Sequence, residues 1–344
     1  MNISIVDPTS YRGWDEQILA FPDYSFFHSA AWARVLREAY GYRPCYFVLA
    51  ENGTITAAIP LMEVESVLTG KRGVSLPFSD TCDPLVRGLE YYKELVKRII
   101  EYGKRRNWKY LEFRGGGALM GDSPPSCTFL EHMLELSMPE EQLLSSFRKG
   151  TKSAVKKAAA EGVEASIHDK DAALEEFYRL NCLTRQRHGL PPQPYQYFKI
   201  LQEMLISKGM GFVVLGTYQG RTIAASVFLH FGKKALYKYG ASDPDFQYLR
   251  ANNIVVWEAI KRYLRNGLEA FDFGRTEPHN EGLRIFKAGW NTKESAINYY
   301  RYDLSRDSFT TNTTAINPLF NTIFNKMPVS ALRLLGNFLY RHMA

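Results

Sequence analysis

One pattern of elements occurs twice in this chain, and it limits the fold more than any other feature. Residues 46–62 read YFVLAENGTITAAIPLM, and residues 212–229 read FVVLGTYQGRTIAASVFL. Each is an apolar run, a polar turn with a glycine and a second apolar run, which is typical of a β-hairpin. Later in each half follows a helix-then-strand pattern, YYKELVKRIIEYGKRRNWKYLEFRGGG from Tyr91 and NNIVVWEAIKRYLRNGLEAFDFGRTE from Asn252. The repetition predicts a duplicated fold.

The second helix-then-strand pattern shows what each copy contains. Its apolar residues recur at helical spacing, as in Ile254, Trp257 and Ile260. An asparagine can cap the start of the helix, and Gly267 can end it. The strand that follows looks buried and ends in Asp-Phe-Gly. We therefore expect an α/β (α+β) chain of two tandem domains, each a mixed sheet flanked by helices, with Glu112 and Asp272 at equivalent strand ends.

The predicted domains cover residues 1–137 and 138–309, and the boundary lies near a helix expected from Pro139 to Gly162. Residues 310–344 form a polar linker and then an amphipathic segment, Leu319 to Tyr340, which Pro328 should break into two short helices. Two interpretations of this segment stay open. It caps the core of the second domain, or it lies on a membrane with Lys326, Arg333 and Arg341 near anionic headgroups.

Composition excludes several classes of protein. A content of 45% hydrophobic and 14% aromatic residues is typical of a folded chain. No apolar run is long enough for a membrane span, and the N-terminus lacks the pattern of a secretory signal. The four cysteines, far apart in the sequence, indicate free thiols in a reducing cytosol rather than a zinc site or disulfides. A net charge of +7 favours anionic partners.

The Asp-Phe-Gly triplet at Asp272 is also the triplet with which protein kinases hold magnesium. A kinase needs a glycine-rich loop, a strand lysine and a His-Arg-Asp loop before this triplet, and this sequence has none of them. Strand ends line the ligand crevice of open α/β sheets, so Asp272 and Arg275 can face substrate. The alternative is an Asp–Arg pair that only fixes the following loop.

Two basic clusters are candidates for anion binding. Arg148, Lys152 and Lys156 recur at helical spacing, with further lysines beside them and no acid between. This ridge is either a solvated helix face or a surface for phosphates, such as those of tRNA or a lipid diphosphate. Arg185 and His188 stand in the other cluster, TRQRHGLPPQPYQYF, where a helix end meets a proline-rich turn, and this arrangement indicates an anion or carboxylate site.

Five segments together resemble the Fem family of nonribosomal peptidyltransferases and their FemAB-related relatives in the GNAT superfamily. They are FFHSAAWARVLREAYGYRPCYFVLA, VSLPFSDTCDPL, RQRHGLPPQPYQYF, RANNIVVWEAIKRYLRNGLEAFDFGRT and GLRIFKAGW. Their order and spacing carry the resemblance, which covers nearly the whole chain. It implies two tandem GNAT-like domains and a transferase of acyl or aminoacyl groups onto a cell-envelope or exopolysaccharide precursor.

The resemblance also implies site residues. Phe286 and Lys287 match the Phe-Lys segment of the family, whose lysine is implicated in catalysis, and a positioned cation stabilises the oxyanion formed during aminolysis. We expect Lys287→Ala to slow transfer with little loss of stability; the alternative is a lysine in a surface loop. Asp272, His188 or the substrate itself can remove the proton. Four further residues on or near the matching segments are predicted to bind substrate: Asp80, Tyr239, Arg250 and Asn253.

Two departures from the family keep the donor open. The tRNA-using enzymes often carry a long helical arm in the second domain, which is missing from this sequence. The CoA-using enzymes have a glycine-containing pyrophosphate loop, and FQYLRANN stands in its place here. The donor is aminoacyl-tRNA or acyl-CoA, with no tightly bound cofactor and no metal. A second hypothesis is a noncatalytic module that binds an anionic glycan lipid or a membrane surface. Under either hypothesis we expect a cytoplasmic protein, with peripheral contact to the inner face of the membrane as an alternative.

Overall fold

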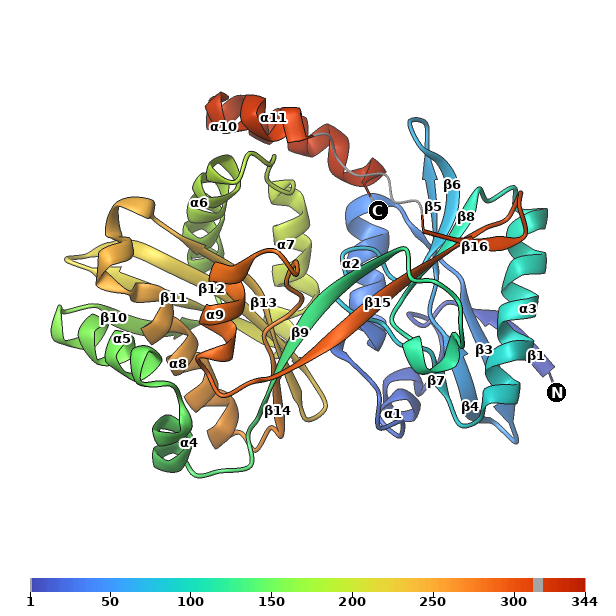
Figure 1. Ribbon diagram of the computed structural model, residues 1–344, viewed down its shortest axis with the longest axis horizontal. Helices are drawn as coiled ribbons and strands as arrows, with labels where there is room; N and C mark the ends of the chain where they lie inside the picture. The colour runs from blue at the N-terminus through green and yellow to red at the C-terminus, as the bar shows by residue number, and fades with distance from the viewer. Residues whose placement is uncertain (1, 312–317, 344) are drawn as a thin grey trace. The chain divides into compact units, whose positions relative to one another are not determined.

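The computed structural model describes residues 2–311 and 318–343 and divides the chain into two compact units (Figure 1). The first unit contains the chain up to Phe129, a stretch from Ala296 and the last residues from Leu339. The second unit begins at Leu130. These boundaries differ from the predicted 1–137 and 138–309, because strand β9 (Cys127–Glu135) and strand β15 (Lys293–Asp303) each start in one unit and end in the other.

The first unit contains two sheets. One has the order β1-β3-β4-β7, and the other joins the end of β15 to β8, β6, β5 and β2. The strands are β1 (Asn2–Val6), β2 (Arg43–Pro44), β3 (Tyr46–Glu51), β4 (Thr54–Ile59), β5 (Met62–Ser66), β6 (Gly70–Val74), β7 (Leu85–Val86), β8 (Tyr110–Arg114) and β16 (Ser308–Thr310). The helices are α1 (Trp14–Ile18), α2 (Ala30–Tyr40) and α3 (Leu89–Arg105). The predicted hairpin is confirmed as β3–β4, with Phe47 opposite Ile59.

The second unit is one sheet with the order β10-β11-β12-β13-β14, followed by the end of β9. Its strands are β10 (Glu164–His168), β11 (Gly211–Tyr218), β12 (Arg221–Phe231), β13 (Lys234–Ser242) and β14 (Ala270–Asp272). Its helices are α4 (Glu140–Ser146), α5 (Lys149–Ala160), α6 (Asp171–Arg187), α7 (Tyr195–Met204), α8 (Ala251–Arg265), α9 (Glu281–Ala288), α10 (Pro318–Lys326) and α11 (Val329–Leu339). Helices α5 and α8 contribute Val155, Val255 and Ile260 to the core on one face of this sheet.

Each unit receives one strand from the other half of the sequence. Strand β8 lies parallel to β6 and antiparallel to β15, and Glu112 stands opposite Val74 and Arg301. Strand β14 lies parallel to β13 and antiparallel to β9, and Asp272 stands opposite Leu236 and Met133. Glu112 and Asp272 also follow the ends of α3 and α8 at the same spacing. Their equivalence is thus a property of the topology, and superposition of the two units stays a prediction.

The prediction of a single helix from Pro139 to Gly162 is wrong. The segment forms two helices, α4 and α5, because Phe147 and Arg148 adopt extended backbone angles between them. Phe147 is buried, and its ring packs edge-on against Trp257 and Trp290. Burial of this ring therefore outweighs continuation of the helix.

The predicted break at Pro328 is confirmed, since α10 ends at Lys326 and α11 begins at Val329. Both helices pack closely on the second unit. A Cβ at Gly189 would meet the carbonyl oxygen of Asn321, and a Cβ at Gly336 would meet that of Pro192. Only glycine allows these approaches. Much of the linker predicted from Thr310 lies outside the described residues. In the described part of the chain, no helix has both the length and the apolar character that crossing a bilayer requires.

Candidate functional site

Lys287 is buried at the end of helix α9. Its side chain belongs to a residue only 3% exposed, and its Nζ donates hydrogen bonds to the carbonyl oxygens of Gly274 (2.7 Å) and Arg275 (3.0 Å). The Asn280 side chain caps the start of α9 by accepting from the Leu283 amide at 3.2 Å. The interpretation of Lys287 as a surface lysine is therefore wrong. Its removal would take a hydrogen-bond donor from two carbonyls, so a loss of stability is now expected in place of the small change predicted from the sequence.

Asp272 builds the turn that holds Lys287. It is the half-buried last residue of β14, and its carboxylate accepts a hydrogen bond from the Gly274 amide at 2.7 Å. Gly274 has a φ of 69°, which glycine adopts without strain. The turn directs the carbonyls of Gly274 and Arg275 to the ammonium group. The structure thus places Lys287 of α9 against the loop that contains Asp272 and Arg275, and the Asp-Phe-Gly triplet shapes a cation site.

A buried histidine that the sequence did not indicate completes this corner. His132 on β9 is 0% exposed, and its Nε2 lies 3.0 Å from a carboxylate oxygen of Glu294, outside hydrogen-bond geometry. Burial, together with the charge of Lys287, lowers the pKa of His132 and favours the neutral imidazole. Glu294 in turn accepts from Arg284 on α9 at 2.8 Å. A lone histidine in the strand CTFLEHMLE was the available signal, but nothing in its sequence neighbourhood connects it with Lys287.

The side chain of Phe286 packs against apolar residues rather than facing a polar site. It is half-buried, lies against the second unit's core, and its ring contacts that of Trp290. Packing of Phe286 fixes the rotation of α9 and so the direction of Lys287. A direct catalytic role for Phe286 stays a prediction.

The other predicted substrate residues of the second unit occupy several elements. Arg185 and His188 lie together at the end of α6, where Arg185 Nε donates to the Pro191 carbonyl at 3.3 Å. Burial, then the charges of Arg187 and Arg185, lowers the pKa of His188. Tyr239 on β13 shares a hydrogen bond with the Tyr197 hydroxyl at 2.8 Å. The structure thus confirms that these cationic side chains lie close together. Binding of an anion by them stays a prediction.

Arg250 and Asn253 stand where a CoA-binding protein would place its pyrophosphate loop. The short 3-10 helix η4 (Pro244–Leu249) leads into α8, and Arg250 between them is exposed with a φ of 58°. The Asn253 amide donates to the Arg250 carbonyl at 2.9 Å. A residue with a long side chain occupies the left-handed position that glycine would fill in a close-fitting anion loop. These residues do not fit a tight pyrophosphate cradle.

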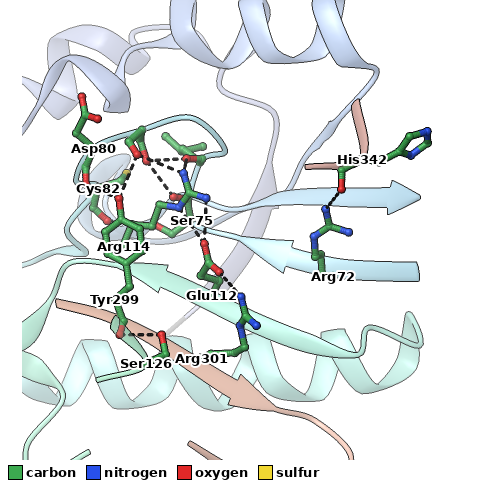
Figure 2. A network of polar contacts seen from close by, with 12 residues as sticks. Arg72, Ser75, Asp80, Cys82, Glu112, Arg114, Ser126, Tyr299, Arg301 and His342 are labelled. Carbon is green, nitrogen blue, oxygen red and sulfur yellow. Dashed lines mark hydrogen bonds and ion pairs between the residues drawn. The ribbon is translucent and has the colours of Figure 1, made fainter. Parts of the chain in front are cut away.

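Asp80 lies in the first unit, in the loop after β6. Its backbone carbonyl accepts from the Tyr299 hydroxyl at 2.6 Å, and Figure 2 shows this loop beside a buried network of charges. In that network Glu112 binds Arg114 and Arg301, each at 3.0 Å. Burial alone would raise the pKa of Glu112, but Arg114 and Arg301 outweigh it and hold the pKa below its usual range. The arginine partners were not predicted from the sequence.

The basic ridge is only partly a helix face. Arg148 precedes α5, and its amide donates to the Gly289 carbonyl at 3.0 Å. Lys152 donates from Nζ to the Ser145 carbonyl at 2.8 Å, whereas Lys156 is exposed. The ridge therefore keeps its positive surface, but Lys152 has one hydrogen bond to exchange before it binds a phosphate.

Comparison with known proteins bears on the family and the fold. Residues 145–284 match the family model of the acetyltransferase (GNAT) domain. A UDP-N-acetylmuramoylpentapeptide-lysine N(6)-alanyltransferase from Weissella viridescens is 28% identical over 140 residues, which are 40% of this chain and 41% of the relative. The match therefore spans less than half of the relative's length.

Solved structures resemble the whole chain. The structure of FemX has a TM-score of 0.69 at 15% identity and covers 94% of this chain and 100% of its own. A tandem GNAT protein from the clavulanic acid biosynthesis pathway has a TM-score of 0.54 at 11% identity and covers 88% of this chain and 98% of its own. These likenesses concern the fold. The predicted resemblance to FemAB-related proteins with the GNAT fold is confirmed.

Proposed function

We propose that this protein transfers an aminoacyl group to an amine of a peptidoglycan precursor. The observation that carries the proposal is the match to an alanyltransferase that acts on the lysine of UDP-N-acetylmuramoylpentapeptide. The buried ammonium of Lys287 supports it, because a cation fixed next to a strand-end loop is the group that aminolysis of an ester requires.

In this reaction the acceptor amine attacks the ester carbonyl of the donor, and a tetrahedral oxyanion forms. Collapse of the oxyanion breaks the ester C–O bond, leaves an amide, and releases the donor's hydroxyl group. Lys287 stabilises the negative oxygen, and its two carbonyl partners keep the ammonium group in place. The amine loses its proton to Asp272, to His188 or to the substrate itself. No covalent enzyme intermediate is needed.

Aminoacyl-tRNA is the proposed donor. The glycine-free connection from η4 to α8 disfavours acyl-CoA, and the ridge of Arg148, Lys152 and Lys156 offers charge for tRNA phosphates. The protein needs no tightly bound cofactor in this mechanism.

Contact with the cytoplasmic membrane face is part of the proposal. Three apolar side chains of α10 and α11 are exposed: Ile323 by 55%, Leu334 by 72% and Phe338 by 57%. Residues 308–344 contain no acid and include Lys326 and Arg333 near these side chains in sequence. Such a surface suits anionic lipids and would hold the enzyme near lipid-linked acceptors.

A transfer assay with the purified full chain tests the function. UDP-N-acetylmuramoylpentapeptide is offered with alanyl-tRNA, with other aminoacyl-tRNAs, or with acetyl-CoA, and mass spectrometry follows the acceptor. A mass gain that needs aminoacyl-tRNA supports the proposal. A mass gain with acetyl-CoA alone would show that the donor is acyl-CoA and not aminoacyl-tRNA. A failure of every donor with this acceptor, a lipid-linked form of it and an exopolysaccharide precursor would favour the noncatalytic module.

A further inference from the structure

The first unit contains a surface pocket that takes no part in the proposed reaction. Its volume is about 750 Å³, within the range of small-molecule sites. The start of β8, the end of β15 and the turn after β15 form its walls. The lining residues used below are Lys104, Lys109, Tyr110, Arg301, Asp303 and Arg306.

The pocket has more cations than its carboxylates can neutralise. Lys104 is paired with Asp307 at 2.7 Å, but both side chains are about half exposed. Arg306 lies 4.0 Å from Asp303 and is 70% exposed. Lys109 is exposed and has no carboxylate partner among the residues that the structure describes. Exposed pairs such as these contribute little and exchange partners readily.

Arg301 adds a further cation to the lining of the pocket. Figure 2 shows Glu112 between Arg114 and Arg301, so one carboxylate serves two guanidinium groups. Arg114 already gives its other N–H groups to the carbonyls of Leu76 and Ser79. Arg301 lines the pocket, with its guanidinium 4.3 Å from the centre of the Tyr110 ring.

The walls are rigid enough to keep these groups in position. The Asp303 carboxylate accepts from the amides of Ser305 and Arg306 at 2.8 and 3.1 Å, which fixes the turn. The Trp108 indole donates to buried Glu63 at 2.6 Å and closes the floor. A ligand would therefore meet cations that are already arranged.

We propose that this pocket binds a small phosphorylated ligand, as a second site located in the first unit. Phosphate fits better than a carboxylate because arginine and lysine side chains converge on one concave region, and a dianion engages several of them. A small ligand fits better than a nucleic acid or a membrane because the cations line a pocket rather than a flat surface.

Binding of inorganic pyrophosphate to the full chain, followed by isothermal titration calorimetry at low ionic strength, tests the site. The double variant Lys109→Gln/Arg306→Gln removes two pocket cations that are exposed and do not hold the core. A matched control, Lys93→Gln/Lys97→Gln, removes two exposed lysines from α3, outside this pocket. We expect the pocket variant to raise the Kd about tenfold or more and the control to change it less than about twofold.

Any other result would contradict the proposal that this pocket binds a phosphorylated ligand. An equal weakening in both variants would show general charge attraction, and the absence of saturable binding by the wild type would show no site at all. Vesicles of phosphatidylglycerol form a further arm. Binding to them that the pocket variant removes, without saturable pyrophosphate binding, would assign these cations to a lipid surface. Calorimetry measures binding directly, so loss of the proposed transferase activity leaves this result unaffected.

Discussion

Strands β8 and β14 hold the same place in the two units but surround their acidic residue differently. Each follows a helix, α3 or α8, and pairs in parallel on one side. On the other side each takes an antiparallel strand from the other half of the sequence. Glu112 on β8 is buried and bound by two arginine side chains. Asp272 on β14 is half-buried and accepts a hydrogen bond from a backbone amide in the turn that holds Lys287.

The difference separates structure from chemistry in a duplicated fold. In the first unit, charges compensate one another inside the protein, and this arrangement fixes strands and loops. In the second unit, the buried ammonium group of Lys287 donates to two backbone carbonyls, an arrangement that suits a cation facing a negative group that forms during a reaction. We therefore propose that catalysis takes place in the second unit, which contains the residues that the GNAT family model matches.

The largest expected effect is that of Glu112→Gln on stability. It leaves Arg114 and Arg301 with a neutral partner, and breaking a buried ion network costs about 3–5 kcal/mol. Urea denaturation, with hydrogen exchange of β8 as a local probe, measures the loss. The control Glu65→Gln removes a carboxylate that is 66% exposed and pairs with Lys71, so it should change stability by less than about 0.5 kcal/mol.

Asp272→Asn provides the counterpart in the second unit. The amide oxygen can still accept from Gly274, so we expect a loss of about 1 kcal/mol or less. A loss as large as that of Glu112→Gln would break the comparison, since it would show that both strand ends depend on a buried charge.

Lys287→Ala should lower the transfer rate about a hundredfold or more, as expected for the loss of oxyanion stabilisation. It should also cost about 1–3 kcal/mol in stability, because the carbonyls of Gly274 and Arg275 lose their donor. Lys287→Met keeps the volume of the side chain, and a matching loss of rate in it would exclude a cavity as the cause. The exposed Lys293, changed to Ala, is the control. Wild-type turnover by either Lys287 variant would remove this residue from the mechanism.

The sequence predicted the parts of this comparison that depend on local patterns. Hairpins, the helix before each strand and the equivalence of Glu112 with Asp272 follow from periodicity and spacing, which repeat in the chain. The side chains that contact these residues from distant parts of the sequence could not be predicted in this way. Arg301 reaches Glu112 from a strand far along the sequence, and His132 reaches the Lys287 corner from the first half. Burial of Lys287 was also missed, because a lysine in GLRIFKAGW looks exposed until the carbonyls that bind it are known.

Acid should affect the corner around His132 before the strand end at Glu112. The pKa of His132 is lowered by burial and by Lys287, so below about pH 6.5 the unfolded chain takes up a proton that the folded chain does not. Stability is therefore full above this pH and falls as the pH drops toward the folded pKa of His132. The pKa of Glu112 is also low, and its contribution is lost only below about pH 4.3.

Hydrogen exchange between pH 7 and pH 4 measures which region loses protection first as the pH falls. Peptides from β9 and α9 should lose protection at a higher pH than those from β8. His132→Gln should remove the part of this early loss that comes from protonation of the histidine. Simultaneous loss in both units would mean that the acid response does not come from these two groups.

The smallest expected effect concerns the surface of the second unit. Lys152→Gln/Lys156→Gln should weaken binding of tRNA, and the slope of log K against log salt should become shallower by about 1–2, because fewer counterions are released. The shift should be nearer the lower value, since Lys152 first has to give up its bond to the Ser145 carbonyl. Lys93→Gln/Lys97→Gln in the first unit is the matched control. A slope that changes only in the ridge variant would assign donor binding to the unit that also holds Lys287; equal slopes in both variants and the wild type would leave α5 a solvated face.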